Sequence, residues 1–224
     1  MSDFLVSPEL IDLGEGCEYD PSVLLGYLTG RKVEDLTLRI GPRARLRSGT
    51  VIYAGTTIGA ELQTGHNVVI REQNHLGDAV QIWNNTTIDY GCRIGSHVKI
   101  HTNCYVAQFT VLEDEVFMAP GVTIANDLHP GCAYSLECMR GPTLKRGVQV
   151  GVNVTLGPWI TIGEHSVIGS GAVVMSDIPP YSLVVGNPGR VIKTLDAVTC
   201  KTGVALEGHS YRPYIHLSNP RTEG

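Results

Sequence analysis

Residues 82–100 read IWNNTTIDYGCRIGSHVKI, in which an isoleucine returns at every sixth position. Continued in both directions, this spacing gives fifteen positions between 40 and 124, and fourteen of them are Ile, Leu, Val or Met. The column consists of Ile40, Leu46, Ile52, Ile58, Thr64, Ile70, Leu76, Ile82, Ile88, Ile94, Ile100, Val106, Leu112, Met118 and Ile124. A six-residue repeat of this kind indicates a series of short strands, each with one large side chain facing inward.

A second column, four residues after the first, consists mainly of Ala, Thr, Val and Cys and runs from Ala44 to Val122. Because side chains alternate across a strand, the large and the small residue of each hexad both face a narrow core. Gly and Asn recur between the two columns, and both tolerate the positive φ of a turn. Glycines at 41, 59, 77 and 95 lie 18 residues apart. Three hexads therefore make one coil, and the sequence predicts an all-β fold, a parallel β-helix of triangular cross-section.

The repeat loses its phase after Ile124 and resumes, shifted by two residues, at Leu144. Residues 127–143 are therefore expected to leave the helix as an extruded loop. Five coils before this loop and two after it make about seven coils.

The two ends of a solenoid need covers. We expect residues 1–35 to form an N-terminal cap and residues 36–189 to form the β-helix. Residues 190–224 are then a short C-terminal helix, for which RVIKTLDAVTC (190–200) is the candidate, followed by a tail.

Composition narrows the functional classes. The formal net charge is −5 and no long basic run occurs, which argues against a nucleic-acid partner. No stretch of 18 apolar residues and no signal peptide is present, so we expect a cytoplasmic protein with no membrane partner. In a reducing compartment the six cysteines are expected to be free thiols, and without a CxxC pair no zinc-thiolate site is expected.

The hexads, the single extruded loop and the closing segment VGNPGRVI (185–192) resemble the left-handed β-helix acyltransferases of the hexapeptide-repeat family. Within that family, residues 99–130 and 141–164 are most similar to enzymes that acetylate an amino group on a nucleotide-linked deoxy-amino sugar. The left-handed coil, a homotrimer and acetyl-coenzyme A held between neighbouring chains are what this resemblance implies. The acceptor it implies is a small molecule, and no metal cofactor is implied.

Direct attack of a sugar amine on a thioester requires a neutral amine held about 3–3.5 Å from the carbonyl, a donor for the oxyanion and a proton acceptor. The 18-residue coil gathers polar residues at one corner. His101 is the candidate general base there, and Asn103 stands where relatives place a polar residue against the acceptor, although Asn103 also occupies a turn position. Three further residues of this corner, expected to bind substrate, are His66, Asn84 and Asn85.

Asn126, Asp127 and His129 open the loop and are expected to face a neighbouring chain. Asp127 is a catalytic candidate that binds the ammonium or hydroxyls of the acceptor, and Asn126 and His129 are substrate-binding candidates. Alternatively, Asn126 and Asp127 only cap the turn at the strand end. His129 stands where relatives often carry an aromatic residue, which favours a basic or hydrogen-bonding role.

Four cations lie in or after the last coils and are candidates for binding the coenzyme phosphates, the alternative being ordinary solvated charges. Three coil-corner residues are candidates for lining the pantetheine track. These seven cofactor-binding candidates are Lys145, Arg146, Arg190, Lys193, Gly121, Gly151 and Pro158. Cys92 and Cys104 belong to the small inward column and are expected in the core.

Three other functions remain open from the sequence. O-acetylation of a small hydroxyl acceptor is the nearest. A γ-carbonic-anhydrase-like metalloprotein is suggested by His97 and His101, but their hexad phase places them at different corners. A non-enzymatic assembly module is the third, and the long loop and the polar corner argue against it.

Overall fold

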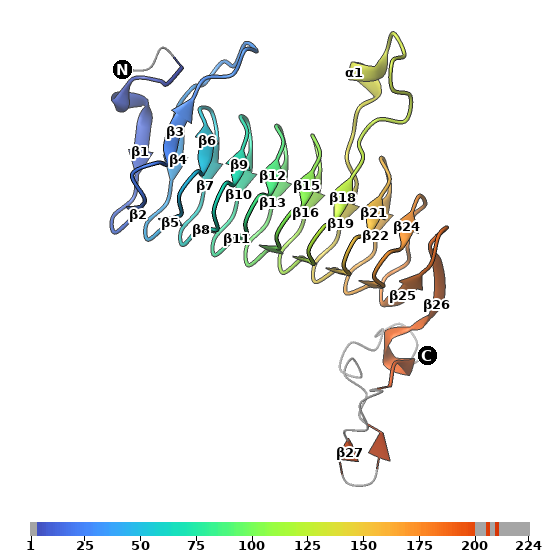
Figure 1. Cartoon of the computed structure of the whole chain (residues 1–224). Helices are drawn as coiled ribbons and strands as arrows, with labels where there is room; N and C mark the ends of the chain where they lie inside the picture. Colours follow the sequence, from blue (N-terminus) through green and yellow to red (C-terminus); the bar gives the residue numbers. More distant parts are fainter. Residues whose placement is uncertain (1–3, 200–204, 207–208, 211–224) are drawn as a thin grey trace, which may run out of the picture.

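The computed structural model describes residues 4–199, 205–206 and 209–210. Its strands are short and stack into three parallel sheets that form the faces of a prism (Figure 1). Sheet 1 contains β1 (Ile11–Leu13), β4 (Leu38–Ile40), β7 (Thr57–Ile58), β10 (His75–Leu76), β13 (Arg93–Ile94), β16 (Val111–Leu112), β19 (Thr143–Leu144) and β22 (Thr161–Ile162).

The other two faces are built from strands of the same length. Sheet 2 contains β2 (Glu18–Tyr19), β5 (Arg45–Leu46), β8 (Gln63–Thr64), β11 (Gln81–Ile82), β14 (Lys99–Ile100), β17 (Phe117–Met118), β20 (Gln149–Val150), β23 (Val167–Ile168), β25 (Ser182–Val185) and the antiparallel β26 (Arg190–Thr194). Sheet 3 contains β3 (Leu24–Tyr27), β6 (Val51–Tyr53), β9 (Val69–Ile70), β12 (Thr87–Ile88), β15 (Tyr105–Val106), β18 (Thr123–Ile124), β21 (Thr155–Leu156) and β24 (Val173–Val174).

The hexad column forms the core, as predicted. Ile82, Ile88 and Ile100 are fully buried, and each pairs in register with the residue 18 positions away in the next coil. The small column is buried beside it, for example at Val80 and Cys92. One large and one small side chain per hexad therefore fill the interior of the prism.

The β-helix begins earlier than the sequence indicated. Strands β4 to β24 make the seven expected coils, but β1, β2 and β3 pair in parallel with β4, β5 and β6 and add an eighth coil within the segment expected to be only a cap. A 3-10 helix, η1 (Pro8–Leu10), precedes this coil. The repeat was missed because residues 28–37 leave the helix between β3 and β4 and break its phase.

The predicted extruded loop is confirmed. It leaves after β18 and returns at β19, and it carries the helix α1 (Ser135–Cys138). In Figure 1 the loop and the shorter excursion at 28–37 project on the same side of the prism.

The predicted C-terminal helix over 190–200 is wrong for most of its length. Residues 190–194 form β26, which pairs with β25, and only a 3-10 turn, η2 (Leu195–Ala197), follows. Because β25 ends its sheet with a free edge and Val191 and Ile192 are β-branched, strand pairing is favoured over a helix. Of the predicted tail, only β27 (Ala205–Leu206) and β28 (His209–Ser210) lie within the described residues, and they pair antiparallel.

Three edges join the sheets, and we name two of them. The asparagine edge connects sheet 2 to sheet 3 and includes residues 65–67, 83–85 and 101–103. The charged edge connects sheet 3 to sheet 1, includes residues 71–73 and 89–91, and gives rise to both excursions. The third edge connects sheet 1 to sheet 2.

Candidate active site

The structure confirms that the predicted polar corner is one continuous column, the asparagine edge. The backbone amide of Asn85 donates to the carbonyl of His66 at 2.9 Å, and the amide of Asn103 donates to the carbonyl of Asn84 at 2.9 Å. Asn85 and Asn103 have φ values of 56° and 60°. Both therefore form the turn that the repeat requires, and their side chains point away from the core.

Some side chains along this edge already have hydrogen-bond partners within the chain, and others do not. Asn84 Oδ1 accepts a hydrogen bond from the backbone N of His66 at 2.8 Å, and the His66 ring is 2.7 Å from Ser48 Oγ. Asn85 Oδ1 accepts from Asn67 at 3.3 Å. These three sequence candidates thus help to hold successive coils together.

His101 and Asn103 have uncommitted functional groups. The His101 ring packs beside Phe117 with ring centroids 5.0 Å apart, and within the described part of the chain neither the imidazole nor the Asn103 amide has a hydrogen-bond partner. His101 is half-buried and Asn103 is exposed. Both are available to a ligand on this edge.

Asp127 lies at the start of the extruded loop and holds its first turn. Its Oδ1 accepts from the backbone N of His129 at 2.8 Å, and its Oδ2 accepts from Ser135 Oγ of α1. The hydrogen bond from Ser135, followed by that from the His129 backbone, lowers the pKa of Asp127 below its usual range. Asp127 is therefore an anion at neutral pH, and the capping role considered for it is confirmed by these contacts.

The loop is clamped where it joins the prism. The carbonyl of Asn126 accepts from the backbone N of Arg140 at 2.7 Å, which ties the outgoing stem to the returning one. On the next coil, Trp159 Nε1 donates to the Cys138 carbonyl at 2.6 Å, and the Arg140 guanidinium lies 5.0 Å from the Trp159 ring centre. The loop root is consequently part of the rigid scaffold.

Within one chain the two sets of candidate residues lie on different edges of the prism. Asp127 and His129 leave the charged edge after sheet 3, whereas His101 and Asn103 lie on the asparagine edge before sheet 3.

The cofactor candidates are distributed over all three edges and the end of the prism. Gly121 and Gly151 follow β17 and β20 on the asparagine edge, and Pro158 is buried on the charged edge. Arg190 and Lys193 are exposed on β26. Lys145 and Arg146 are both engaged by acidic residues.

Lys145 and Arg146 lie on the third edge. Lys145 Nζ is 2.7 Å from Glu113 Oε1, and Arg146 pairs with Asp114 at 3.0 Å. The hydrogen bond to Asp114 raises the pKa of Arg146. Lys145 also lines a cavity of about 660 Å³ near the C-terminal coils, together with Glu164 and Asp177. A phosphate at this place would meet several carboxylates.

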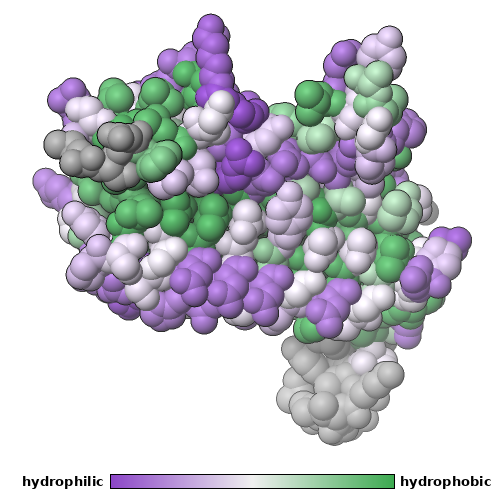
Figure 2. Space-filling model, turned by 45° about the horizontal axis from the view of Figure 1, so that its top comes forward, coloured by the Kyte–Doolittle hydropathy of each residue, from purple (hydrophilic) through white to green (hydrophobic). Residues whose placement is uncertain are grey.

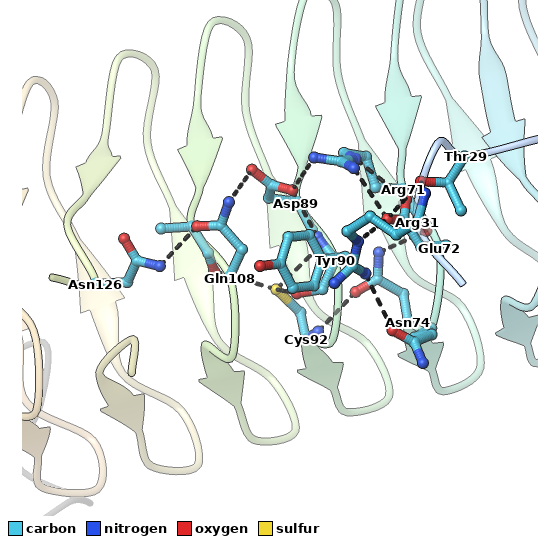
Figure 3. A network of polar contacts seen from close by, with 12 residues as sticks. Thr29, Arg31, Arg71, Glu72, Asn74, Asp89, Tyr90, Cys92, Gln108 and Asn126 are labelled. Carbon is cyan, nitrogen blue, oxygen red and sulfur yellow. Dashed lines mark hydrogen bonds and ion pairs between the residues drawn. The ribbon is translucent and has the colours of Figure 1, made fainter. Parts of the chain in front are cut away.

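The charged edge carries polar residues that the sequence reasoning did not single out. Glu72 is fully buried and accepts hydrogen bonds from Thr29, Arg31 and Arg71 (Figure 3). Arg71 also binds Asp89 at 3.0 Å. Arg71 and Asp89 are 18 positions apart, so the coil period could have paired them, but Arg31 comes from an excursion outside the repeat.

The cysteines in the described residues are unpaired. Cys92 and Cys104 are buried as predicted, and burial raises the pKa of the Cys92 thiol to about 12 and that of Cys104 in the same direction. Neither is a nucleophile at neutral pH. Among the described residues no group of three His, Cys, Asp or Glu side chains is arranged to hold a metal, and no helix there is long and apolar enough to cross a membrane.

Comparison with known proteins defines the class. A family model described as bacterial transferase hexapeptide (six repeats) matches residues 141–175. The galactoside O-acetyltransferase of Escherichia coli (strain K12) is 30% identical over 172 residues, which cover 69% of this chain and 81% of that protein. The chain therefore belongs to the hexapeptide-repeat acyltransferase family, and its β-helix is left-handed.

Two further comparisons bear on this result. The acyl-[acyl-carrier-protein]–UDP-N-acetylglucosamine O-acyltransferase of Gloeothece citriformis is 27% identical over 159 residues, covering 68% of this chain. The chain spans only 52% of the length of that relative. The crystal structure of a putative acetyltransferase from Bacillus cereus matches with a TM-score of 0.52 and 22% identity, covering 80% of this chain and 84% of that one, and it supports the fold.

Proposed function

We propose that this protein is an acetyl-coenzyme-A-dependent acyltransferase whose acceptor is an amino group on a nucleotide-linked deoxy-amino sugar. The observation that carries the proposal is the pair of uncommitted polar groups, His101 and Asn103, on an edge where His66, Asn84 and Asn85 are engaged in holding the coils together. Family membership supports acyl transfer, and a relative named for a UDP-sugar supports a nucleotide-linked sugar as the acceptor, although that relative is an O-acyltransferase.

The reaction needs no covalent enzyme intermediate. The neutral amine attacks the thioester carbonyl, the carbon–sulfur bond breaks, and the thiolate leaves while the amine nitrogen loses a proton. Asp127 is poorly suited to accept that proton because its pKa is lowered. His129 is exposed and its backbone N–H is bonded to Asp127, whereas the His101 ring packs against Phe117. We therefore assign proton acceptance to His129 and positioning of the acceptor to His101 and Asn103.

The proposed assembly is a homotrimer with one site at each boundary between chains. The separation of His129 and Asn103 on different edges supports it, because a site that uses both residues would be completed by a neighbouring chain. Mixing His129→Asn chains with Asn103→Gly chains after unfolding and refolding tests this directly. We expect the mixture to regain part of the activity that each variant lacks, and no gain would place the whole site within one chain.

The coenzyme is proposed to lie along the asparagine edge beside Gly121 and Gly151. Arg190 and Lys193 are the better phosphate ligands, because Lys145 and Arg146 are paired with acidic residues. Replacing Arg190 and Lys193 by Gln should raise the KM of acetyl-coenzyme A about tenfold, as expected for charge-assisted hydrogen bonds.

O-acetylation of a sugar hydroxyl is the second candidate, and the 30% identity to a galactoside O-acetyltransferase favours it. Purified protein should be supplied with acetyl-coenzyme A and with matched nucleotide sugars that carry either an amino or a hydroxyl group, and thiol release should be followed. Release with the amino sugars alone supports the first proposal. Release with the hydroxyl sugars alone supports the second, and no release with any acceptor would refute both.

A further inference from the structure

Asp89 sets the orientation of the Asn126 side-chain amide at the loop root through Gln108, which lies between them. This carboxylate is 6% exposed and is surrounded by donors. Its Oδ1 accepts from Arg71 at 3.0 Å and from the Tyr90 backbone at 2.8 Å. Its Oδ2 accepts from the Tyr105 hydroxyl at 2.8 Å and from Gln108 Nε2 at 2.6 Å. A carboxylate only accepts hydrogen bonds, so Gln108 must turn its NH2 group towards Asp89.

Gln108 in turn orients Asn126, which lies on the next coil. With its NH2 group held by Asp89, Gln108 presents Oε1 on its other side, where Asn126 Nδ2 donates to it at 2.6 Å. Asn126 is therefore fixed with its NH2 group towards Gln108 and its Oδ1 on the opposite side, as Figure 3 shows. In the described part of the chain Asn126 Oδ1 has no hydrogen-bond partner, and Asn126 is half-buried.

The backbone holds Asn126 equally firmly. The Gln108 carbonyl accepts from the backbone N of Gly141 at 3.2 Å, and the Asn126 carbonyl accepts from Arg140. A Cβ on Gly141 would lie 2.2 Å from Thr110 Oγ1, so only glycine allows the returning stem to pass this close. Gln108 thus contacts both stems of the loop that carries Asp127 and His129.

We propose that Asp89 and Gln108 are positioning residues that make Asn126 an obligate hydrogen-bond acceptor in the acyl-acceptor site. The site then selects a substrate that offers an N–H or O–H donor at this point and disfavours one that offers only acceptors. This inference rests on the proposed acyltransferase function. It adds that the acceptor substrate must offer a hydrogen-bond donor to Asn126 at the loop root. In Figure 2 the surface between the two excursions is largely hydrophilic, as a site for a polar acceptor requires.

The test uses Gln108→Leu, Asn126→Ala and the double variant, with Gln63→Leu on β8 as the control of equal size outside the network. Steady-state KM is measured for acetyl-coenzyme A and for the nucleotide sugar that the wild-type protein acetylates fastest. If Gln108→Leu weakens one hydrogen bond to the acceptor, it should raise the KM of the acceptor about three- to tenfold. The KM of acetyl-coenzyme A should stay unchanged. The control should change neither value.

The double variant distinguishes positioning from general loosening of the loop. If Gln108 acts through Asn126, Gln108→Leu has no further effect on the acceptor KM once Asn126 is Ala. Additive effects, or an unchanged acceptor KM in Gln108→Leu, would overturn the inference while the wild-type protein remains active. Absence of thiol release from the wild-type protein would instead refute the proposed function, and with it the role of Asn126 as a substrate contact.

Discussion

The asparagine edge and the charged edge occupy equivalent places in the same repeat but solve the packing of polar groups in opposite ways. Residues 65–67, 83–85 and 101–103 of the asparagine edge include no Asp, Glu, Lys or Arg, and amides there bond to the equivalent residue of the next coil, as Asn67 does to Asn85. The charged edge buries two carboxylates, Glu72 and Asp89, and neutralises them with Arg71 and with Arg31 from an excursion. A neutral edge can be extended by repetition alone, whereas buried charge needs partners of specific sign and reach.

The largest expected effect is on kcat, and it distinguishes His129 on the loop from His101 on the asparagine edge. His129→Asn on the loop should lower kcat about 10²–10⁴-fold, because it removes the proton acceptor. His101→Asn on the asparagine edge should lower kcat less than about tenfold, because it removes only a positioning contact. Thiol release at saturating substrate measures both, and the reverse order would exchange the roles assigned to the two residues.

The next effect concerns stability and tests the buried charge. Glu72→Ala should lower the free energy of unfolding by about 2–3 kcal/mol, since it leaves two arginines without their shared buried partner while both retain some access to water. Urea denaturation measures the change. Glu61→Ala is the matched control, because its ion pair with Arg43 is exposed and should contribute less than about 1 kcal/mol.

A smaller effect is expected at the turn position of the asparagine edge. Asn103 has a φ of 60°, so Asn103→Ala should destabilise the protein by about 1 kcal/mol through backbone strain, and Asn103→Gly should not. Both variants lack the amide and should lose activity equally. Thermal melting compared with turnover separates the turn from the substrate contact. An Asn103→Gly variant with full activity would show that Asn103 serves the turn alone.

The smallest effect is a change of the loop with pH. Because the folded pKa of Asp127 lies below its ordinary 3.8, ionisation of Asp127 stabilises the loop above about pH 4, and this contribution is lost as the pH falls through the lower folded value. Trp159 reports the change because its indole is bonded to the loop carbonyl of Cys138. In a Trp83→Phe background its fluorescence should shift below about pH 4, and Asp127→Asn should remove the acid transition.

Much of the candidate site followed from the 18-residue period. His66, Asn85, His101 and Asn103 were placed in one column by sequence alone, because each falls in the same three-residue corner of its coil. The roles of Asn84 and Asp127 as backbone caps needed the structure, since a polar side chain at a turn suits either a cap or a ligand. Arg31 gave no sequence signal because it lies on an excursion outside the repeat. Gln108 stands 18 positions before Asn126, but its contact with Asp89 spans 19 positions and does not follow the coil period.

The sequence by itself determined the β-helix, its inward columns and the loop, because a six-residue period in hydrophobic side chains has one compact solution in which every strand stacks on its neighbour. Only the tertiary structure decided that an eighth coil lies before the first excursion and that residues 190–194 pair as a strand. It also decided that the two excursions share the charged edge. These outcomes depend on a free strand edge and on charges from distant segments that neutralise one another. Neither feature produces a periodic pattern in the amino-acid sequence.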